Sequence, residues 1–301
     1  MNRSGSDDDG AYTAQFLTVI RATVRRLLPG IMEAHNAPAH NAPARQAKIK
    51  SDGSFVTDTD QAVEAEFLAA LRIALPGLPV LAEESIEENV RAFNGAASDF
   101  YAPFMASPYQ IVIDPIDGTK NFVEGQNEFC IAAALTRRHA DGVWPIAGVV
   151  AIPTEDRMYW SDEKAAFSET ISSGIIEPLT RSESINAPVS VSSTDRRWLE
   201  REKLALRGEW ISSGSSVHDM IGTVSGRLRA SLIGTQRLWD IAAPLAIAAR
   251  LNLVLRDAIS GEEIRSIRAE DLSSELHRRP WGLDRHWILM APTTELSDIF
   301  G

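Results

Sequence analysis

Cysteine, positive charge and long apolar stretches are all scarce in this sequence of 301 residues. The single cysteine, Cys130, excludes an internal disulfide and is typical of a reducing compartment, so we expect a cytoplasmic protein. No run of about 18 apolar residues occurs, and no apolar signal segment follows the polar head MNRSGSDDDG. The sequence therefore predicts neither a membrane-spanning helix nor a secretory signal.

Positive charge is outnumbered, with 30 Lys and Arg against 41 Asp and Glu and a net charge of −11. General binding to nucleic acid or to an anionic membrane needs a positive field, so we expect neither partner. A small phosphorylated substrate remains compatible with this charge, because a bound divalent cation reverses the local sign. The hydrophobic content of 44% and the charged content of 24% are those of a globular protein with a sizeable core.

The most informative segment is Asp114–Phe122, DPIDGTKNF. The apolar, β-branched run before it predicts a buried strand, which would end where Asp114 and Asp117 present two carboxylates. The backbone amides of Gly118 and Thr119 could then face one anion. Carboxylates for a hard cation beside N–H groups for a phosphate indicate a metal-assisted phosphoryl site. The alternative is an ordinary Asx-type turn after a strand.

Four further acidic residues lie at the ends of predicted elements. Asp60 is near the start of a predicted helix, where capping is the simplest role for it. Glu83 and Glu84 follow a short predicted strand, an unusual place for two adjacent acids. Asp240 lies near the start of the largely apolar helix predicted over Arg237–Arg250, where it could be an N-cap or a third metal ligand.

The order of predicted strands and helices divides the chain into two domains. Strands dominate the first half, whereas strands and helices alternate in the second. We expect a disordered head over residues 1–11, an α+β domain with the metal site over 12–180 and an α/β domain over 181–301. Residues 35–44 repeat the unit HNAPA, which is typical of a linker. Residues 86–108 are expected to form a helix and then a long loop that acts as a flap near the site.

Three motifs in this order resemble the inositol monophosphatase superfamily: Glu83-Glu84-Ser85, the DPIDGTKNF string and Trp239-Asp240. That superfamily includes inositol monophosphatases, bacterial and archaeal fructose-bisphosphatases, and 3′(2′),5′-bisphosphate nucleotidases. The resemblance extends from about residue 12 to 291, because supporting segments are also in register: 56–61, 148–153 and 213–216. It implies a layered αβαβα sandwich of the α+β class. It also implies a Mg²⁺-dependent, lithium-sensitive phosphomonoesterase, which is commonly a homodimer.

The resemblance also implies roles for particular residues. The metal ligands would be the carboxylates of Glu83, Asp114, Asp117 and Asp240 and the backbone carbonyl of Ile116. Glu84 would lie outside this ligand shell, and roughly two or three Mg²⁺ ions would bind. Thr119 would orient the attacking water together with Glu83, and Asp60 would hold the Thr119 hydroxyl. The substrate would contact Asp117, Gly118, Thr119, Lys120, Gly214, Ser215 and Asp240.

The sequence departs from the inositol monophosphatase pattern in the region that would contact the sugar. Those enzymes have a glutamate seven residues before the Trp-Asp aspartate, and Ile233 stands there in this chain. Isoleucine accepts no hydrogen bond from a hydroxyl. A shifted loop would bring Gln236 or Arg237 to that place instead. Lys120 and the segment Gly125–Phe129 resemble the corresponding segments of the bisphosphate nucleotidase branch. Lys120, together with Arg237, could then meet a second phosphate; the alternative is a solvated lysine.

These observations predict a Mg²⁺-dependent phosphomonoesterase that hydrolyses a small phosphorylated metabolite by attack of a metal-activated water. The substrate would be similar to an inositol monophosphate or would be 3′-phosphoadenosine 5′-phosphate. The alternative function is a catalytically idle family member that binds a phosphorylated ligand or a metal. A purely structural role for all the acidic residues would require a coincidence at three separate motifs.

Overall fold

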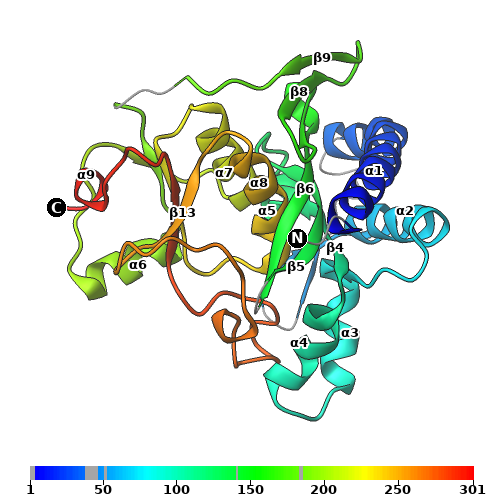
Figure 1. The fold of residues 1–301 in the computed structure, drawn as a ribbon. Helices are drawn as coiled ribbons and strands as arrows, with labels where there is room; N and C mark the ends of the chain where they lie inside the picture. The colour runs from blue at the N-terminus through cyan, green and yellow to red at the C-terminus, as the bar shows by residue number, and fades with distance from the viewer. Residues whose placement is uncertain (1–3, 38–46, 51–52, 140–141, 183–185) are drawn as a thin grey trace.

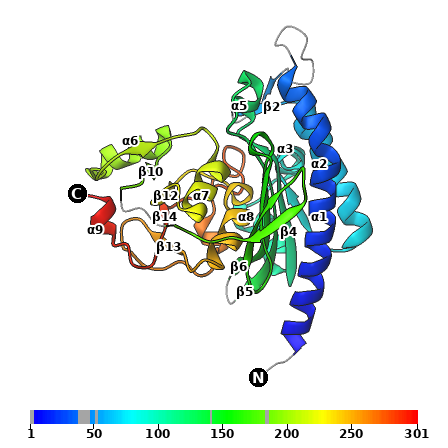
Figure 2. The same ribbon diagram turned by 90° about the horizontal axis from the view of Figure 1, so that it is seen from above.

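The computed structural model describes residues 4–37, 47–50, 53–139, 142–182 and 186–301. Its elements form five layers, in which two sheets alternate with three layers of helices (Figure 1 and Figure 2). The predicted αβαβα sandwich is confirmed. None of the helices in these residues combines the length and the hydropathy needed to cross a bilayer.

The first sheet has seven strands in the order β3-β4-β5-β6-β7-β8-β9. Only β3 and β4 run parallel, and every later pair is antiparallel. The strands are β3 (Val80–Ala82), β4 (Tyr109–Asp117), β5 (Cys130–His139), β6 (Gly142–Ile152), β7 (Arg157–Ser161), β8 (Ala166–Thr170) and β9 (Ile175–Pro178). The helices α1 (Ser4–Asn36) and α2 (Asp58–Ala74) cover its outer face (Figure 2).

The second sheet has five strands in the order β11-β10-β12-β14-β13. Its strands are β10 (Val189–Ser190), β11 (Trp210–Ile211), β12 (Ala230–Ile233), β13 (Val254–Asp257) and β14 (Trp287–Met290). Between the two sheets lie α7 (Ser216–Ser225) and α8 (Leu238–Ala249), and α6 (Ser193–Glu202) and α9 (Leu296–Ile299) lie outside the second sheet (Figure 1). The remaining elements are β1 (Lys48–Ile49), β2 (Phe55–Val56), α3 (Glu83–Ala92), α4 (Ala97–Ala106), α5 (Thr119–Glu124), η3 (Pro153–Glu155) and η4 (Ala269–Asp271).

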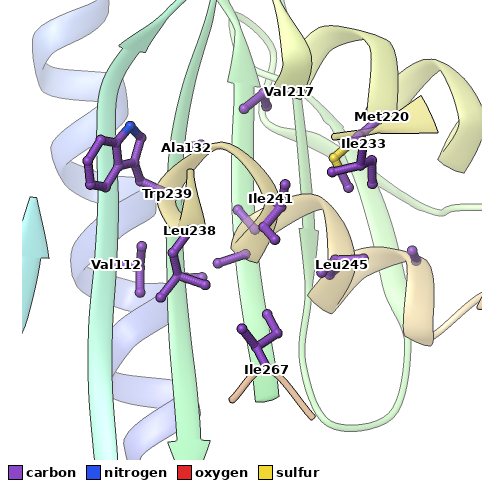
Figure 3. Packing of buried hydrophobic residues seen from close by; sticks show 14 of the residues in the cluster. Val112, Ala132, Val217, Met220, Ile233, Leu238, Trp239, Ile241, Leu245 and Ile267 are labelled. Atoms are coloured by element: carbon purple, nitrogen blue, oxygen red, sulfur yellow. The ribbon is translucent and has the colours of Figure 1, made fainter. Parts of the chain in front are cut away.

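The apolar core between the sheets is organised around α8. This helix is apolar around its circumference, and its side chains Leu238, Trp239 and Ile241 pack against β4 and β5 (Figure 3). The same cluster continues to Trp287 of β14, so the two sheets share one core. The predicted boundary at residues 180 and 181 falls in the connection between the sheets, and the division into two domains stays a prediction.

The first helix begins earlier than predicted. Residues 4–11, which the sequence suggested to be part of a disordered head, are the first turns of α1, whereas residues 1–3 lie outside the described residues. Asp9 explains the order, because its carboxylate accepts a 2.6 Å hydrogen bond from the Tyr109 hydroxyl and forms an ion pair with Arg137. Acidic side chains near a helix N-terminus also stabilise the helix by interacting favourably with its dipole.

The segment 86–108 is also more ordered than predicted. In place of a helix and a long loop, it forms most of α3 and all of α4. Local sequence patterns did not predict α4, because Pro103 lies inside it and proline is unfavourable within a helix. Tertiary packing stabilises it: Tyr101 and Phe104 contact Trp281, with ring centroids 4.5 and 5.0 Å away, and the Tyr101 hydroxyl donates to the Ser273 carbonyl at 2.8 Å. The predicted flap is therefore a packed helical pair.

Helix α2 begins with a capping box that also fixes a predicted site residue. The Thr57 hydroxyl accepts from the Asp60 amide at 3.3 Å, and Asp60 Oδ2 accepts from the Thr57 amide at 2.9 Å. Capping is thus one role of Asp60, as the sequence suggested. We expect Thr57→Ala to lower the free energy of unfolding by about 1–2 kcal/mol, because the cap is lost at a buried position. Urea denaturation measures this.

The control for that variant is Thr18→Ala at an exposed position of α1. It should change the free energy of unfolding by less than about 0.5 kcal/mol. An equal loss in both variants would show that the Thr57 cap contributes nothing beyond a surface threonine.

Candidate active site

A one-residue bulge in β4 turns two acidic side chains to the same face. Along a regular strand, residues three apart point to opposite faces. Here the pairing with β5 shifts, because Asp114 lies opposite Ala132 whereas Asp117 lies opposite Cys130. The β4 strand therefore contains one residue more than β5 in this interval. The predicted strand end is in fact a strand that continues through its own bulge.

Asp240 completes a group of three carboxylates. It lies in the first turn of α8, and its Oδ2 accepts a 2.8 Å hydrogen bond from the Arg237 amide. Carboxylate oxygens of Asp114, Asp117 and Asp240 all lie within 4.8 Å of one another. A group of carboxylate oxygens without histidine or cysteine suits a hard cation such as Mg²⁺ better than zinc.

The hydrogen bonds of these carboxylates show where a cation fits. Asp117 Oδ2 accepts from the Ser215 hydroxyl and, at 3.0 Å, from the Val217 amide at the start of α7. Both oxygens of Asp114 are buried, and neither has a hydrogen-bond partner among the described residues. A buried carboxylate without partners is costly unless a positive charge compensates it. The residues present therefore fit a divalent metal ion.

The electrostatics of the group agree with its geometry. Burial, followed by the neighbouring carboxylates, raises the pKa of Asp114 and of Asp117 well above the usual value. Burial and the charge of Glu83 raise the pKa of Asp240 to about 7. The fold thus holds several acids close together in a place where their charged forms are disfavoured. A cation bound there would lower these pKa values again.

Glu83 and Glu84, at the first turn of α3, share a partner that the sequence did not reveal. The Lys50 ammonium lies 2.8 Å from an oxygen of each glutamate, and all three side chains are largely buried. Burial and the charge of Glu83 raise the pKa of Glu84 to about 8. Burial by itself would lower the pKa of Lys50, but the two glutamates raise it above its usual value. The sequence alone does not distinguish Lys50 from a solvated surface lysine, because its two partners lie more than 30 residues further along the chain.

The side chains of Thr119 and Asp60 are joined by a hydrogen bond. The Thr119 hydroxyl lies 3.0 Å from Asp60 Oδ1 and 3.0 Å from the Ile116 carbonyl oxygen, so one proton serves two acceptors. Burial is the main cause that raises the pKa of Asp60 to about 6. This arrangement fixes the hydroxyl next to the carbonyl that the sequence suggested as a metal ligand.

A cavity of about 280 Å³ brings most of the predicted site residues together. Its walls include Glu83, Asp114, Ile116, Asp117, Gly118, Thr119, Lys120, Gly214 and Asp240. Asp60 and Ser215 lie behind this wall. Asp60 accepts a hydrogen bond from the Thr119 hydroxyl, and the Ser215 hydroxyl donates one to Asp117. Arg237 and Trp239 also contribute to it.

Two glycines allow the backbone to approach this closely. Gly118 has φ +82°, and an added Cβ would lie 2.8 Å from the Glu128 carbonyl oxygen. Gly214 has φ +85°, and an added Cβ would lie 2.9 Å from Asn121 Oδ1. Asn121 itself links the two turns, because its amide group donates to the carbonyls of Glu128 and Ser213 at 2.6 and 2.8 Å. Larger residues would be strained at both turns.

A family model described as "Inositol monophosphatase family" matches residues 14–265. The chain belongs to this family. A probable inositol 1-monophosphatase of Mycobacterium tuberculosis is 31% identical over 220 residues, 69% of this chain and 73% of that protein. A 3′(2′),5′-bisphosphate nucleotidase of Shigella flexneri is 28% identical over 216 residues, 69% of this chain and 78% of that one.

The solved structures agree in fold. An IMPase/NADP phosphatase, determined with Mg²⁺ and phosphate, superposes with a TM-score of 0.65 and 18% identity, covering 95% of this chain and 94% of that one. The predicted class is therefore confirmed: the chain is a phosphomonoesterase of the inositol monophosphatase family. Relatives with different substrates match at similar identity, so family membership does not select between inositol phosphates and bisphosphate nucleotides.

Proposed function

We propose that this protein is a Mg²⁺-dependent phosphatase that hydrolyses the monoester of a small phosphorylated metabolite. The observation that supports this most is Asp114, a buried carboxylate with no hydrogen-bond partner in the described residues, beside Asp117 and Asp240. Such a cluster is unfavourable by itself and favourable around cations. The homodimer, the cytoplasmic location and the absence of a nucleic-acid partner stay predictions.

The metal ligands would be the carboxylates of Asp114, Asp117, Asp240 and Glu83 and the carbonyl of Ile116, and roughly two or three ions would bind. When bound, Mg²⁺ would supply a water of lowered pKa and would neutralise charge on the phosphate. Glu83 lines the same cavity as the three aspartates, although its carboxylate is paired with Lys50. Glu84 shares that lysine and would remain outside the ligand shell.

The chain's own groups would orient the reaction. Asp60 holds the Thr119 hydroxyl at 3.0 Å, which favours a role for Thr119 in positioning the attacking water with Glu83. The amides of Gly118 and Thr119 would donate to the phosphate oxygens. Gly214 and Ser215 would contact the remainder of the substrate. Gly214 forms part of the wall of the metal cavity.

Four positions bear on the choice of substrate. Lys120 is exposed and lies 3.8 Å from Glu124, so a second phosphate would have to compete with that glutamate. Ile233 and Gln236 both line a neighbouring cavity, whereas Arg237 lines the metal cavity. Gln236 Oε1 already accepts from the amides of Gly234 and Thr235 at 2.6 and 2.9 Å. These contacts favour neither inositol nor a bisphosphate nucleotide over the other.

Phosphate release from the purified protein, with Mg²⁺ or with EDTA, tests the proposed function. Inositol 1-phosphate, 3′-phosphoadenosine 5′-phosphate and fructose 1,6-bisphosphate serve as substrates. We expect Mg²⁺-dependent release from at least one monoester and no release with EDTA. Release that is unaffected by EDTA would contradict the metal site. Mg²⁺ binding without any release would favour the idle, ligand-binding alternative.

A further inference from the structure

The motif Glu83-Glu84-Ser85 ends in a serine to which the proposed function assigns no role. The Ser85 hydroxyl donates a hydrogen bond to Oε1 of Glu64, which belongs to α2. The backbone amide of Glu84 donates to Oε2 of the same residue at 2.7 Å. Glu64 is only 3% exposed. Both oxygens of a buried carboxylate are therefore bonded to the first turn of α3.

Helix α3 has no side-chain cap of its own. The first amides of a helix lack partners within the helix, and a serine, threonine, aspartate or asparagine at the N-cap often accepts from them. The N-cap of α3 is Ala82, whose side chain makes no such hydrogen bond. Glu64 supplies the acceptor from a different helix, and its negative charge lies at the positive end of the α3 dipole. The start of α3 is thus fixed by α2.

The same turn of α3 holds Glu83 at the metal cavity. Glu83 is the first residue of α3, and Ala82 before it pairs in parallel with Ile113 of β4. The next residue of β4 is Asp114, and both Glu83 and Asp114 line the metal cavity. A ligand must lie within about 0.5 Å of its place to bind well. A small rotation of the first turn of α3 would therefore move Glu83 out of range.

Asp60 and Glu64 act from the same face of one helix. They are four residues apart on α2, so their side chains share a face, and both are buried. Asp60 accepts from the Thr119 hydroxyl at 3.0 Å, whereas Glu64 accepts from the turn that begins with Glu83. Thr119 and Glu83 are the two residues that would position the attacking water. One turn of α2 thus holds both of them.

We propose that Glu64 is a positioning residue for the metal site. Its carboxylate fixes the first turn of α3 and thereby the direction of the Glu83 side chain, and it contacts neither the metal nor the substrate. Ser85 is the second anchor of the same carboxylate, which gives the last residue of the motif a role. This inference rests on the proposed Mg²⁺-dependent function. Residues that orient a metal ligand affect metal affinity and activity together.

The experiment measures the Kd of Mg²⁺ by calorimetric titration, and kcat with the preferred of the three substrates named above. In Glu64→Ala we expect Kd to rise and kcat at saturating Mg²⁺ to fall, each by about 10- to 100-fold. Glu64→Gln keeps an oxygen that can accept from the Glu84 amide, so it should restore most of both quantities. Ser85→Ala, at an exposed position, removes one of the two bonds and should raise Kd by about threefold or more. Glu66→Ala is the matched control on the exposed face of α2 and should leave Kd and kcat unchanged.

Thermal unfolding in EDTA separates positioning from a purely structural role. A lower Tm in Glu64→Ala with an unchanged Kd for Mg²⁺ would overturn the inference and leave the phosphatase function standing. If Glu64→Ala does not fold, Ser85→Ala decides, and a Kd equal to that of the unmodified protein would overturn the inference. If the unmodified protein binds Mg²⁺ but releases no phosphate, the enzymatic function fails while the calorimetric comparison still tests Glu64. No binding of Mg²⁺ to the unmodified protein would overturn both.

Discussion

Asp114→Asn should remove nearly all turnover and leave the fold intact. The carboxylate lies at the centre of the acidic group with both oxygens unpartnered, so a neutral amide would weaken the cation site directly. We expect kcat to fall by at least about a thousandfold, which is the scale of losing a group that stabilises transition-state charge. Phosphate release under saturating Mg²⁺ measures this.

The same variant should be more stable than the unmodified protein when no metal is present. Glu83, Asp117 and Asp240 all oppose the ionisation of Asp114, and an asparagine relieves that repulsion. We expect Tm in EDTA to rise by about 3 °C or more. Asp99→Asn, at an exposed position of α4, serves as the control, with little change in either quantity. Normal Mg²⁺-dependent activity in Asp114→Asn would show that the site is wrongly assigned.

Without metal, the protein should lose stability as the pH rises from about 4 to about 8. A carboxyl group whose pKa is higher in the folded state than in the unfolded chain binds its proton more tightly when folded. Its contribution is therefore complete below the unfolded pKa of about 4 and is lost as the pH rises through the folded pKa. Those folded pKa values are about 6 for Asp60, about 7 for Asp240 and about 8 for Glu84.

The loss should amount to several kcal/mol, because each unit of pKa difference corresponds to about 1.4 kcal/mol and several groups contribute. Mg²⁺ should reverse it, and should raise Tm much more at pH 8 than at pH 5. Thermal unfolding in EDTA and in Mg²⁺ at both pH values measures these differences, with Asp114→Asn expected to show a weaker dependence. A Tm in EDTA that increases from pH 5 to pH 8 would contradict the electrostatic account.

Much of the site was predictable because its residues are close in sequence or follow recognisable elements. The DPIDGTKNF string gave a strand, two acids and a glycine turn, and Trp239-Asp240 gave an acid at a helix start. The bulge that turns Asp114 and Asp117 to one face was not predictable, because it depends on the register with β5. A strand pattern alone would place the two side chains on opposite faces.

Contacts between distant segments account for the other differences. Lys50 reaches Glu83 and Glu84 only after β1 and α3 come together, and Glu64 caps α3 only after α2 and α3 meet. The order of residues 4–11 likewise depends on Tyr109 and Arg137, far along the chain. Local patterns carry no information about such pairs.

The origin of the three aspartates links the chemistry to the assembly of the whole molecule. Asp114 and Asp117 belong to the seven-stranded sheet, whereas Asp240 begins a helix that both sheets bury. Neither half of the chain holds a complete set of ligands, so the site exists only when the layers have docked. Because metal ions would bind only the docked state, metal binding stabilises that state and couples the layers into one cooperative unit. An enzyme built in this way is active only as a fully assembled fold, and a partly folded chain would have no residual catalysis.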